Sequence, residues 1–575
     1  MKLNKIFLFA LPAVFALNSC VDLDYNEVSN RDEEWTYDYF NEGVKNMIWD
    51  VYAQMYNNEF DANSTSFLAG ATDEAQYALE IGAVNNYFNG GWSTANPMSN
   101  TWTKSYTALT EIHTILEKID KINLEDWKYN DNYDIWKQQL DNFSYELRFL
   151  RAYFYFELFK TYGDVPLVTT TLTNGQANNM ERTPADKVVK FIVDELDEIA
   201  TYLPISYADE PYAEIGRATR CAAYALKART LLYAASPLHN PNKDQRKWKE
   251  AAVASKYVID HATAWGLKLS DYAALWGNDS FYNKEIIFGL GRPASNSFEM
   301  ANYPIGVENG SSGNCPTQSL VDQYEYIETG KTFGETHPGK TIDLSSNPYE
   351  GLDPRFALTV VKNGDEWPTN GTQKKAIETF VGGFNAAPKY GATSTGYYLR
   401  KLVDGSCVTT ADVQTQVNKQ HTWIVMRLAE FYLNFAEAMF YATNGHSNES
   451  VIHIIGEEDI DLKMTANEAI NVLRKRKNIE MPVFTTEDGE VWVTRYERER
   501  LVELAFENHR FWDVRRWKKG NQYFKNITVA TITDGGNTLT REIKTRNWDE
   551  KYNLFPIPQS ERLINGKLTQ NNGWE

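Results

Sequence analysis

Residues 146–168 read ELRFLRAYFYFELFKTYGDVPLV, and this stretch decides the fold class. Its apolar side chains recur every three or four residues, at Leu147, Leu150, Phe154 and Leu158. That spacing is typical of one face of an α-helix, and aromatic residues cover a second side. The sequence therefore predicts a helix over residues 141–162 that is buried all round and ends at Gly163 and Pro166.

Helical patterns continue on the C-terminal side of this stretch. Thr183 is expected to cap a helix that has Pro184 in its first turn and ends before Pro204, because threonine and proline favour those positions. Residues 217–235 and 244–264 predict two more helices.

Helices are predicted again near the C-terminus. Residues 426–441 carry one apolar stripe, and a long charged helix is expected over residues 494–517. Between them, Thr465 and Glu468 predict a capping box at the start of a helix over residues 466–477. Several helix pairs have the lengths found in tetratricopeptide repeats, although no regular period is present.

The segment between the helical regions is different in composition. Residues 266–420 are rich in Gly, Asn, Ser, Thr and Tyr, with short strand-like pieces such as residues 285–288. Long loops of this kind in a compact protein usually carry function or disorder. We expect a mainly α protein in which residues 35–265 and 421–575 are helical and residues 266–420 form a loop-rich, irregular ligand-binding region.

The N-terminus resembles a bacterial lipoprotein signal. Lys2 and Lys5 precede a largely apolar run over residues 6–17, which is too short to span a bilayer. Leu-Asn-Ser-Cys at residues 17–20 resembles a lipobox. Residues 1–19 are therefore expected to be removed, Cys20 to be lipidated, and the polar stretch up to residue 34 to act as a tether; the alternative is an ordinary signal peptide.

The composition excludes some partners and leaves others open. The chain has 575 residues, 58 Lys and Arg against 77 Asp and Glu, and a formal charge of −19, so it repels phosphate backbones and nucleic acid is not expected as a partner. No apolar run after residue 20 is long enough to cross a membrane. Aromatic residues make up 14% of the chain; they either pack between helices or stand exposed as stacking platforms.

Alternating charges at the C-terminal end predict ion pairs rather than catalysis. Acidic and basic residues follow one another every three positions, at Glu507, Arg510, Asp513 and Arg516. Such residues can tie a helix to its neighbours. Glu503 and Glu507 could serve as an acid and a base, but the flanking cations would hold both ionised. The chain has no GxSxG, HExxH or phosphate-loop motif, so no enzyme activity and no cofactor are expected.

Metal sites and disulfides are not indicated either. The acidic stretches at residues 130–132 and 457–459 lack the spacing of an EF-hand, and no metal is expected. Cys221 lies in a helical core pattern. Cys315 and Cys407 lie in loop-like sequence, and whether they form a disulfide stays open.

Several motifs resemble the SusD/RagB family, and they keep their order from about residue 102 to the end. The motifs are ELRFLRAYFYFEL at 146–158, YGDVPLV at 162–168, RLAEFYLNFAEA at 427–438, INVLRKR at 470–476, ERLVELAFE at 499–507, RFWDVRRW at 510–517, PIPQ at 556–559 and LTQNNG at 568–573. The chain departs from the family at His113, where Asn is frequent, and at Asn508, where Gly is usual.

The resemblance implies an outer-membrane, cell-surface lipoprotein that binds oligo- or polysaccharide and works as a lid with a SusC-type TonB-dependent barrel. It also implies a tetratricopeptide-like helical scaffold with loops that hold the ligand. Sugar rings stack on aromatic faces, and their hydroxyls bind polar side chains. The candidate ligand residues are Asp73, which relatives often place at the ligand, and Tyr87, Trp92, Asn96, Trp276 and Tyr303 from the loops.

Three other functions remain open at this point. Some relatives handle peptides, so a peptide-binding, RagB-like lipoprotein is one alternative. A scaffold of a surface complex that binds no small ligand is the second. A surface glycoside hydrolase is the third, and the sequence favours it least.

Overall fold

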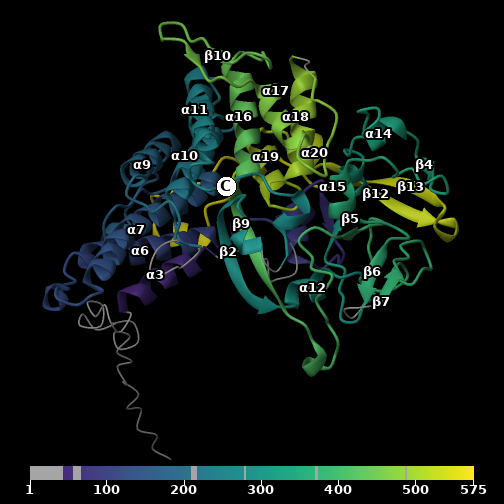
Figure 1. Cartoon of the computed structure of the whole chain (residues 1–575), viewed down its shortest axis with the longest axis horizontal. Coiled ribbons are helices and arrows are strands. Elements are labelled where there is room, and N and C mark those ends of the chain that lie inside the picture. Colours follow the sequence, from purple (N-terminus) through teal and green to yellow (C-terminus); the bar gives the residue numbers. More distant parts are fainter. Residues whose placement is uncertain (1–42, 56–66, 209–215, 278–279, 370–372, 486–487) are drawn as a thin grey trace, which may run out of the picture.

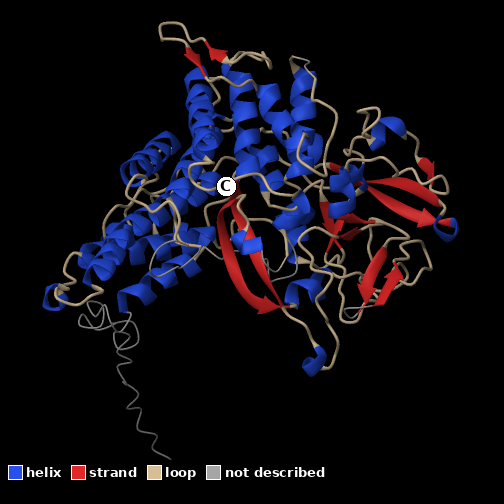
Figure 2. Cartoon of the chain, in the orientation of Figure 1, coloured by secondary structure: helices blue, strands red, loops and turns tan. Residues whose placement is uncertain are grey.

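The computed structural model describes residues 43–55, 67–208, 216–277, 280–369, 373–485 and 488–575 (Figure 1). The expected signal sequence, Cys20 and the tether lie outside these residues. The described part is mainly helical, as the sequence predicts (Figure 2). Within it, no helix is long and apolar enough to cross a membrane.

The main helices pack on one another in a continuous series. In chain order they are α3 (Gly43–Ala53), α6 (Thr101–Ile119), α7 (Tyr133–Tyr162), α9 (Ala185–Ile199), α10 (Arg220–Ala235), α11 (Gln245–His261), α16 (Leu428–Ala442), α17 (Ala466–Arg474) and α18 (Glu490–Glu503). Helix α11 packs on α16, so the series continues across the whole loop-rich segment (Figure 1). Shorter helices include α5 (Asn86–Asn89), α8 (Asn174–Ala177), α12 (Ser297–Asn302), α13 (Gln318–Val321), α14 (Phe333–Thr336), α15 (Pro354–Thr359), α19 (His509–Arg516), α20 (Gly520–Tyr523) and α21 (Gln559–Ile564).

Helix α7 is the buried helix that the opening stretch predicts. It begins at Tyr133, earlier than expected, and its residues from Ala152 to Tyr162 are all buried. It ends at Gly163, whose φ of 73° is readily adopted only by glycine. Because α6 and α9 both pack against it, α7 forms the centre of the N-terminal helices.

The predicted helix caps are confirmed in one case and wrong in another. Thr465 and Glu468 form the expected reciprocal capping box of α17. Thr183 does not cap α9; it forms a β-bridge with Val165. The Ala185 N–H at the start of α9 instead donates to Asp164 Oδ1, at 2.8 Å. A carboxylate from the preceding loop therefore replaces the local threonine cap.

Small antiparallel sheets organise the loop-rich region and segments on either side of it in the sequence (Figure 2). Their pairs are β2 (Ile286–Ser295) with β9 (Lys419–Arg427), β1 (Ala75–Tyr77) with β3 (Asn314–Pro316), β5 (Val360–Val361) with β8 (Tyr398–Leu399), β6 (Glu366–Thr369) with β7 (Gln373–Ala376), and β10 (Val451–Ile452) with β11 (Ile460–Asp461). A further sheet has the order β12 (Asn526–Thr533), β13 (Thr538–Thr545) and β4 (Thr341–Asp343). Strands from distant parts of the chain therefore fix these loops.

The expected helix over residues 494–517 is wrong, because the structure has two helices there. Helix α18 ends at Glu503 and α19 begins at His509. Phe506 and Asn508 between them adopt left-handed backbone conformations, with φ of 62° and 64°. Glu503 at the end of α18 and Glu507 in the break both bind the buried guanidinium of Arg427.

The alternating charges near this break form the ion pairs that the sequence predicts. Arg510 binds Asp73 at 2.7 Å, Asp513 binds Arg500 at 2.6 Å, and Arg516 binds Glu437 at 2.6 Å. These partners lie on separate segments of the fold. The pairs therefore connect α19 to the N-terminal loop, to α18 and to α16.

The three described cysteines, Cys221, Cys315 and Cys407, are buried and free. The pairing of Cys315 with Cys407 that the sequence left unresolved does not occur. Both side chains instead pack in one small apolar cluster with Tyr303, Trp367 and other residues of the loop-rich region. Among the described residues, no group of three or more potential ligands could hold a metal ion.

The left-handed backbone at Asn508 can be tested by substitution. Asn508→Ala should lower the free energy of unfolding by about 1 kcal/mol, because a Cβ without a compensating polar group is strained at positive φ. Asn508→Gly removes the same side chain without that strain and serves as the control. Urea unfolding of both variants measures the difference, and equal stabilities of the Ala and Gly variants would contradict the backbone argument.

Candidate ligand-binding surfaces

Asp73 lies in a buried ion pair instead of at an open ligand site. Its carboxylate is 7% exposed and accepts two hydrogen bonds from Arg510 of α19, at 2.9 and 2.7 Å. The Arg510 guanidinium also lies over the Tyr523 ring, at 4.1 Å. In this conformation Asp73 holds the N-terminal loop on α19, and its carboxylate is not open to a sugar.

Glu74, the next residue, is a buried acid with an altered pKa. Burial raises its pKa to about 8, and the backbone N–H of Phe506 donates to its Oε1 at 3.1 Å. Glu74 therefore holds the left-handed residue at the break between α18 and α19. At neutral pH it is largely protonated, which avoids the cost of burying a charge.

Trp92 and Tyr87 form part of an aromatic cluster. Trp92 is 4% exposed, stacks on Tyr552 at 5.0 Å and meets Phe555 edge-on at 4.7 Å. Tyr87 packs edge-on against Trp92, at 5.0 Å. Both rings are covered by neighbouring rings, so neither presents the free face that the sequence interpretation gave them. Their aromatic character serves packing, which was the alternative explanation of the high aromatic content.

The other expected site residues are not brought together with these. Tyr303 is 1% exposed and donates to the carbonyl oxygen of Asp404 at 2.7 Å. Trp276 is half-buried, and the Lys401 ammonium lies 4.4 Å from its ring centroid. Asn96 is exposed, and its amide donates to the carbonyl oxygen of Gly91 at 2.8 Å.

Aromatic side chains that are open to solvent lie elsewhere in the loop-rich region. Tyr390 is 79% exposed and Phe384 is 53% exposed, and both belong to the loop over residues 381–392. This loop lies against a second one: the side chain of Leu79 is next to Gly391, 3.5 Å from the position that a Cβ atom would occupy there. We call residues 79–82 and 381–392 together the loop surface. Sequence reasoning missed these rings, although they lie in the region that it identified as ligand-binding.

The loop surface is held in a fixed shape by hydrogen bonds from its base. The Asn85 amide donates to the carbonyl oxygens of Leu79 and Glu80, at 3.0 and 2.9 Å. The Phe384 N–H donates to Glu378, at 2.8 Å, and the Lys389 ammonium lies 3.6 Å from the Phe384 ring centroid. The surface therefore combines fixed apolar faces with an exposed carboxylate at Glu80 and an ammonium at Lys389.

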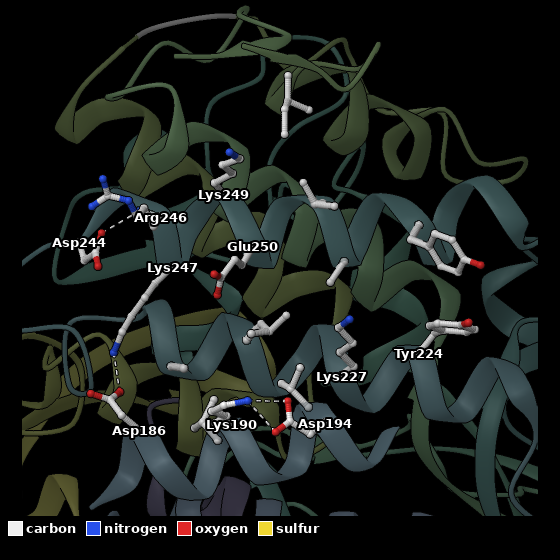
Figure 3. A pocket seen from close by; sticks show the side chains of 18 residues that line it. Asp186, Lys190, Asp194, Tyr224, Lys227, Asp244, Arg246, Lys247, Lys249 and Glu250 are labelled. Atoms are coloured by element: carbon white, nitrogen blue, oxygen red, sulfur yellow. Dashed lines mark hydrogen bonds and ion pairs between the residues drawn. The ribbon is translucent and has the colours of Figure 1, made fainter. Parts of the chain in front are cut away.

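A separate groove of about 840 Å³ lies along helices α9, α10 and α11. Its walls carry many charged side chains, which Figure 3 shows around an apolar floor. The cations are neutralised within the chain: Lys190 pairs with Asp194 and Lys247 with Asp186, both at 2.7 Å. Ile460 of β11 also lines this groove. Its mixed and paired charges fit a protein surface better than a small anionic ligand.

The acid and base alternative at Glu503 and Glu507 is not supported. Both carboxylates are buried, yet Arg427 and other cations lower the pKa of each below its ordinary value. A general acid needs a raised pKa, so these groups are suited to ion pairs. His509 beside them is half-buried, and desolvation of its ring, reinforced by Arg500, lowers its pKa well below the ordinary value.

Comparison with known proteins identifies the family. The sequence model of the SusD family matches residues 284–574, about half of the chain.

The chain belongs to the SusD family.

A second family, described as "Starch-binding associating with outer membrane", matches residues 23–232 of this SusD-family chain. The SusD-like protein P25 of Formosa agariphila is 22% identical over 501 residues, which cover 83% of this chain and 80% of that protein.

Solved structures share the SusD fold. A SusD-like protein from Bacteroides fragilis has a TM-score of 0.77 at 24% identity, and the match covers 95% of this chain and 99% of that one. A laminarin-binding SusD-like protein has a TM-score of 0.60 at 20% identity, with 92% and 98% covered. These likenesses confirm the predicted mainly α fold.

The departure from the SusD family at Asn508 has a structural explanation. The position adopts φ of 64°, and after glycine, asparagine is among the residues that most readily take this conformation. The substitution therefore keeps the backbone break between α18 and α19. It does not lie within a helix, as the sequence interpretation assumed.

The raised pKa of Glu74 predicts a pH-dependent stability. An unfolded carboxyl ionises near pH 4.5, whereas folded Glu74 keeps its proton to about pH 8. The folded state therefore binds more protons between these values, and its stability falls as the pH rises, by about 1.4 kcal/mol for each unit of pKa difference.

Glu74→Gln mimics the protonated acid and should remove this loss. The variant is expected to match the wild type at pH 5 and to be more stable at pH 8, as measured by urea unfolding at both values. Glu80→Gln, at an exposed carboxyl nearby, is the control. If Glu74→Gln lost as much stability between pH 5 and pH 8 as the wild type does, the assignment would be refuted.

Proposed function

We propose that this chain captures oligo- or polysaccharide at the cell surface and delivers it to a SusC-type TonB-dependent barrel in the outer membrane, as a non-catalytic lid. The observation that carries the proposal is the family match, which extends over both halves of the chain. The starch-binding description of one matching family and the laminarin-binding relative support a glycan as the ligand class.

The loop surface is the proposed place of capture. Tyr390 offers an exposed ring to the C–H face of a sugar, while Glu80 and Lys389 offer an acceptor and a donor to its hydroxyls. Burying about 100 Å² of sugar face contributes roughly 2.5 kcal/mol at about 25 cal/mol/Å², and the entropy cost of association offsets much of this. These magnitudes imply that single sugar units bind weakly. Several units of one glycan together would bind more tightly.

Most of the ligand residues expected from the sequence take supporting roles in this proposal. Asp73, Tyr87, Trp92 and Tyr303 hold the loops from beneath, since all four are buried. Exposed Asn96 and half-buried Trp276 stay as proposed ligand residues. The helical groove of Figure 3 is the proposed contact surface for the barrel, because its paired charges and apolar floor suit a protein partner.

Tyr390→Ala tests the proposed ligand surface. Removing the exposed ring should weaken binding to the recognised glycan about tenfold, which corresponds to about 1.4 kcal/mol. Tyr129→Ala, at a tyrosine that is 89% exposed near the start of α7, is the matched control and should bind as the wild type. Calorimetric titration with maltooligosaccharides, laminarioligosaccharides and a panel of other glycans measures both variants.

The other results of this titration decide between the alternatives. Wild-type binding in Tyr390→Ala would exclude the loop surface as the capture site. Binding of peptides but of no glycan would favour the RagB-like function, and a chain that co-purifies with a barrel yet binds neither would be a scaffold. Release of shorter sugars by the pure protein would show a hydrolase.

The expected lipid anchor predicts a separation of binding from uptake. Cys20→Ala should leave glycan binding by the purified chain unchanged, because residue 20 precedes all the proposed contact residues. Uptake of the same glycan by cells should be lost, since durable anchoring requires acyl chains. Binding assays and growth on the glycan as carbon source measure the two effects, and growth at the wild-type rate would show that the anchor is dispensable.

A further inference from the structure

A second groove, of about 420 Å³, lies between α6, the segment that contains residues 166–180, and α21 with the residues after it. It shares no lining residue with the loop surface or with the groove along α9, α10 and α11. Its walls combine hydroxyl groups, one tyrosine ring and apolar side chains, and each component bears on the ligand that would fit.

One wall presents a row of hydroxyls. Thr103, Thr107 and Thr110 are exposed on α6 and line the groove. Their spacing of four and three residues places them on one face of the helix, one turn apart. A threonine hydroxyl both donates and accepts hydrogen bonds; that of Thr110 already donates to the carbonyl oxygen of Tyr106 at 2.9 Å, so it offers a ligand its acceptor side. The row therefore offers a regular series of contacts to a ligand that carries hydroxyl groups along its length.

The tyrosine ring in the groove is fixed in position. The Tyr106 hydroxyl donates to the carbonyl oxygen of Pro166 at 2.9 Å, and its ring packs against Trp102 with centroids 5.0 Å apart. Ile564 of α21, which is 63% exposed, supplies apolar surface to the groove. A half-buried ring and an aliphatic side chain beside hydroxyls suit the apolar faces of sugar rings.

One buried polar group of the groove has no hydrogen-bond partner in the described part of the chain. His113 is 2% exposed and lines the groove, and its buried Nε2 has no hydrogen-bond partner among the described residues. Burial, reinforced by Arg151, lowers the pKa of His113 to about 4, so the imidazole is neutral at pH 7. An unsatisfied buried nitrogen is destabilising, and a hydrogen bond with a ligand hydroxyl would remove that penalty.

The groove also contains the carboxylate of Glu561, a half-buried residue of α21. None of the described residues that line the groove is Lys or Arg. An anionic ligand would therefore meet an uncompensated negative charge. A neutral polyol satisfies the same carboxylate with its hydroxyls, as acceptor-only carboxylates require.

We propose that this groove is a second binding site for neutral oligosaccharide, separate from the loop surface. The inference rests on the proposed function for its ligand class alone, since the groove, its hydroxyl row and its unpartnered nitrogen are features of this chain's own structure. Two separate sites on one chain would hold a long glycan at two points, which raises its effective concentration at each.

The test uses substitutions that keep the shape of the side chain, and it measures which segments of the chain the bound sugar protects. Thr107→Val and Glu561→Gln together remove one hydroxyl and one charge without changing shape, and both positions lie at the surface, so folding is preserved. Thr494→Val with Glu490→Gln makes the same chemical changes on the exposed face of α18 and is the matched control. Hydrogen–deuterium exchange of the full chain is measured during titration with maltoheptaose and with laminarihexaose.

Protection of residues 101–119 and 166–180 is the expected result in the wild type. It should require about tenfold more sugar in the Thr107→Val, Glu561→Gln variant, and should be unchanged in the Thr494→Val, Glu490→Gln control. Protection confined to residues 79–82 and 381–392 would overturn the second site and leave the proposed function standing. Groove protection that the paired variant does not weaken would overturn the assigned contacts, and no protection anywhere would overturn both proposals.

Discussion

The buried guanidinium of Arg427 connects the strand pair β2–β9 to the C-terminal helices. It is 1% exposed at the end of β9 and binds Glu285 at 2.8 Å, Glu503 at 2.8 Å and Glu507 at 2.7 Å. Glu285 lies next to β2, and the two glutamates lie at the break after α18. The strands on either side of the loop-rich region are therefore locked to the C-terminal helices by one side chain.

Such a cluster gives positional specificity more than net stability. Removing charges from water is costly, and paired charges in an interior recover that cost only when every group is satisfied. Arg355 and Arg476 complete the cluster around Glu503, at 2.9 and 3.2 Å. Loss of one member would leave part of the remaining buried charge uncompensated, so the cluster disfavours alternative packings of α18 on the loops. This constraint explains how irregular loops acquire one shape.

Local patterns in the sequence predict helices such as α7, α10 and α16, because helix periodicity depends on neighbouring residues. The capping box at Thr465 is another such local pattern. The break at Phe506 could not be predicted, since it depends on the Glu74 carboxyl from a segment 432 residues away. Thr183 failed as a cap for the same reason, because Asp164 from the preceding loop competes for the N–H of Ala185.

The candidate site was less predictable than the fold, and the reason is physical. A tryptophan or tyrosine in a loop has the same composition signal whether it faces a sugar or another ring. Trp92 is covered by Tyr552, Phe555 and Trp574, which follow it by more than 450 residues. Tyr390, in contrast, lies in a short loop between fixed segments. Only the three-dimensional arrangement separates rings that support loops from rings that such loops expose.

The division between supporting and exposed rings bears on how one fold can serve different ligands. The similarity to a Bacteroides fragilis structure, with a TM-score of 0.77 at 24% identity, shows that the helical series tolerates wide sequence change. The aromatic cluster beneath the loops and the charges around Arg427 determine where the loops lie. Side chains at their tips, such as Tyr390, touch little of the core. Substitution at these tips can therefore change the ligand without disturbing the fold, because function resides in the site that the fold carries.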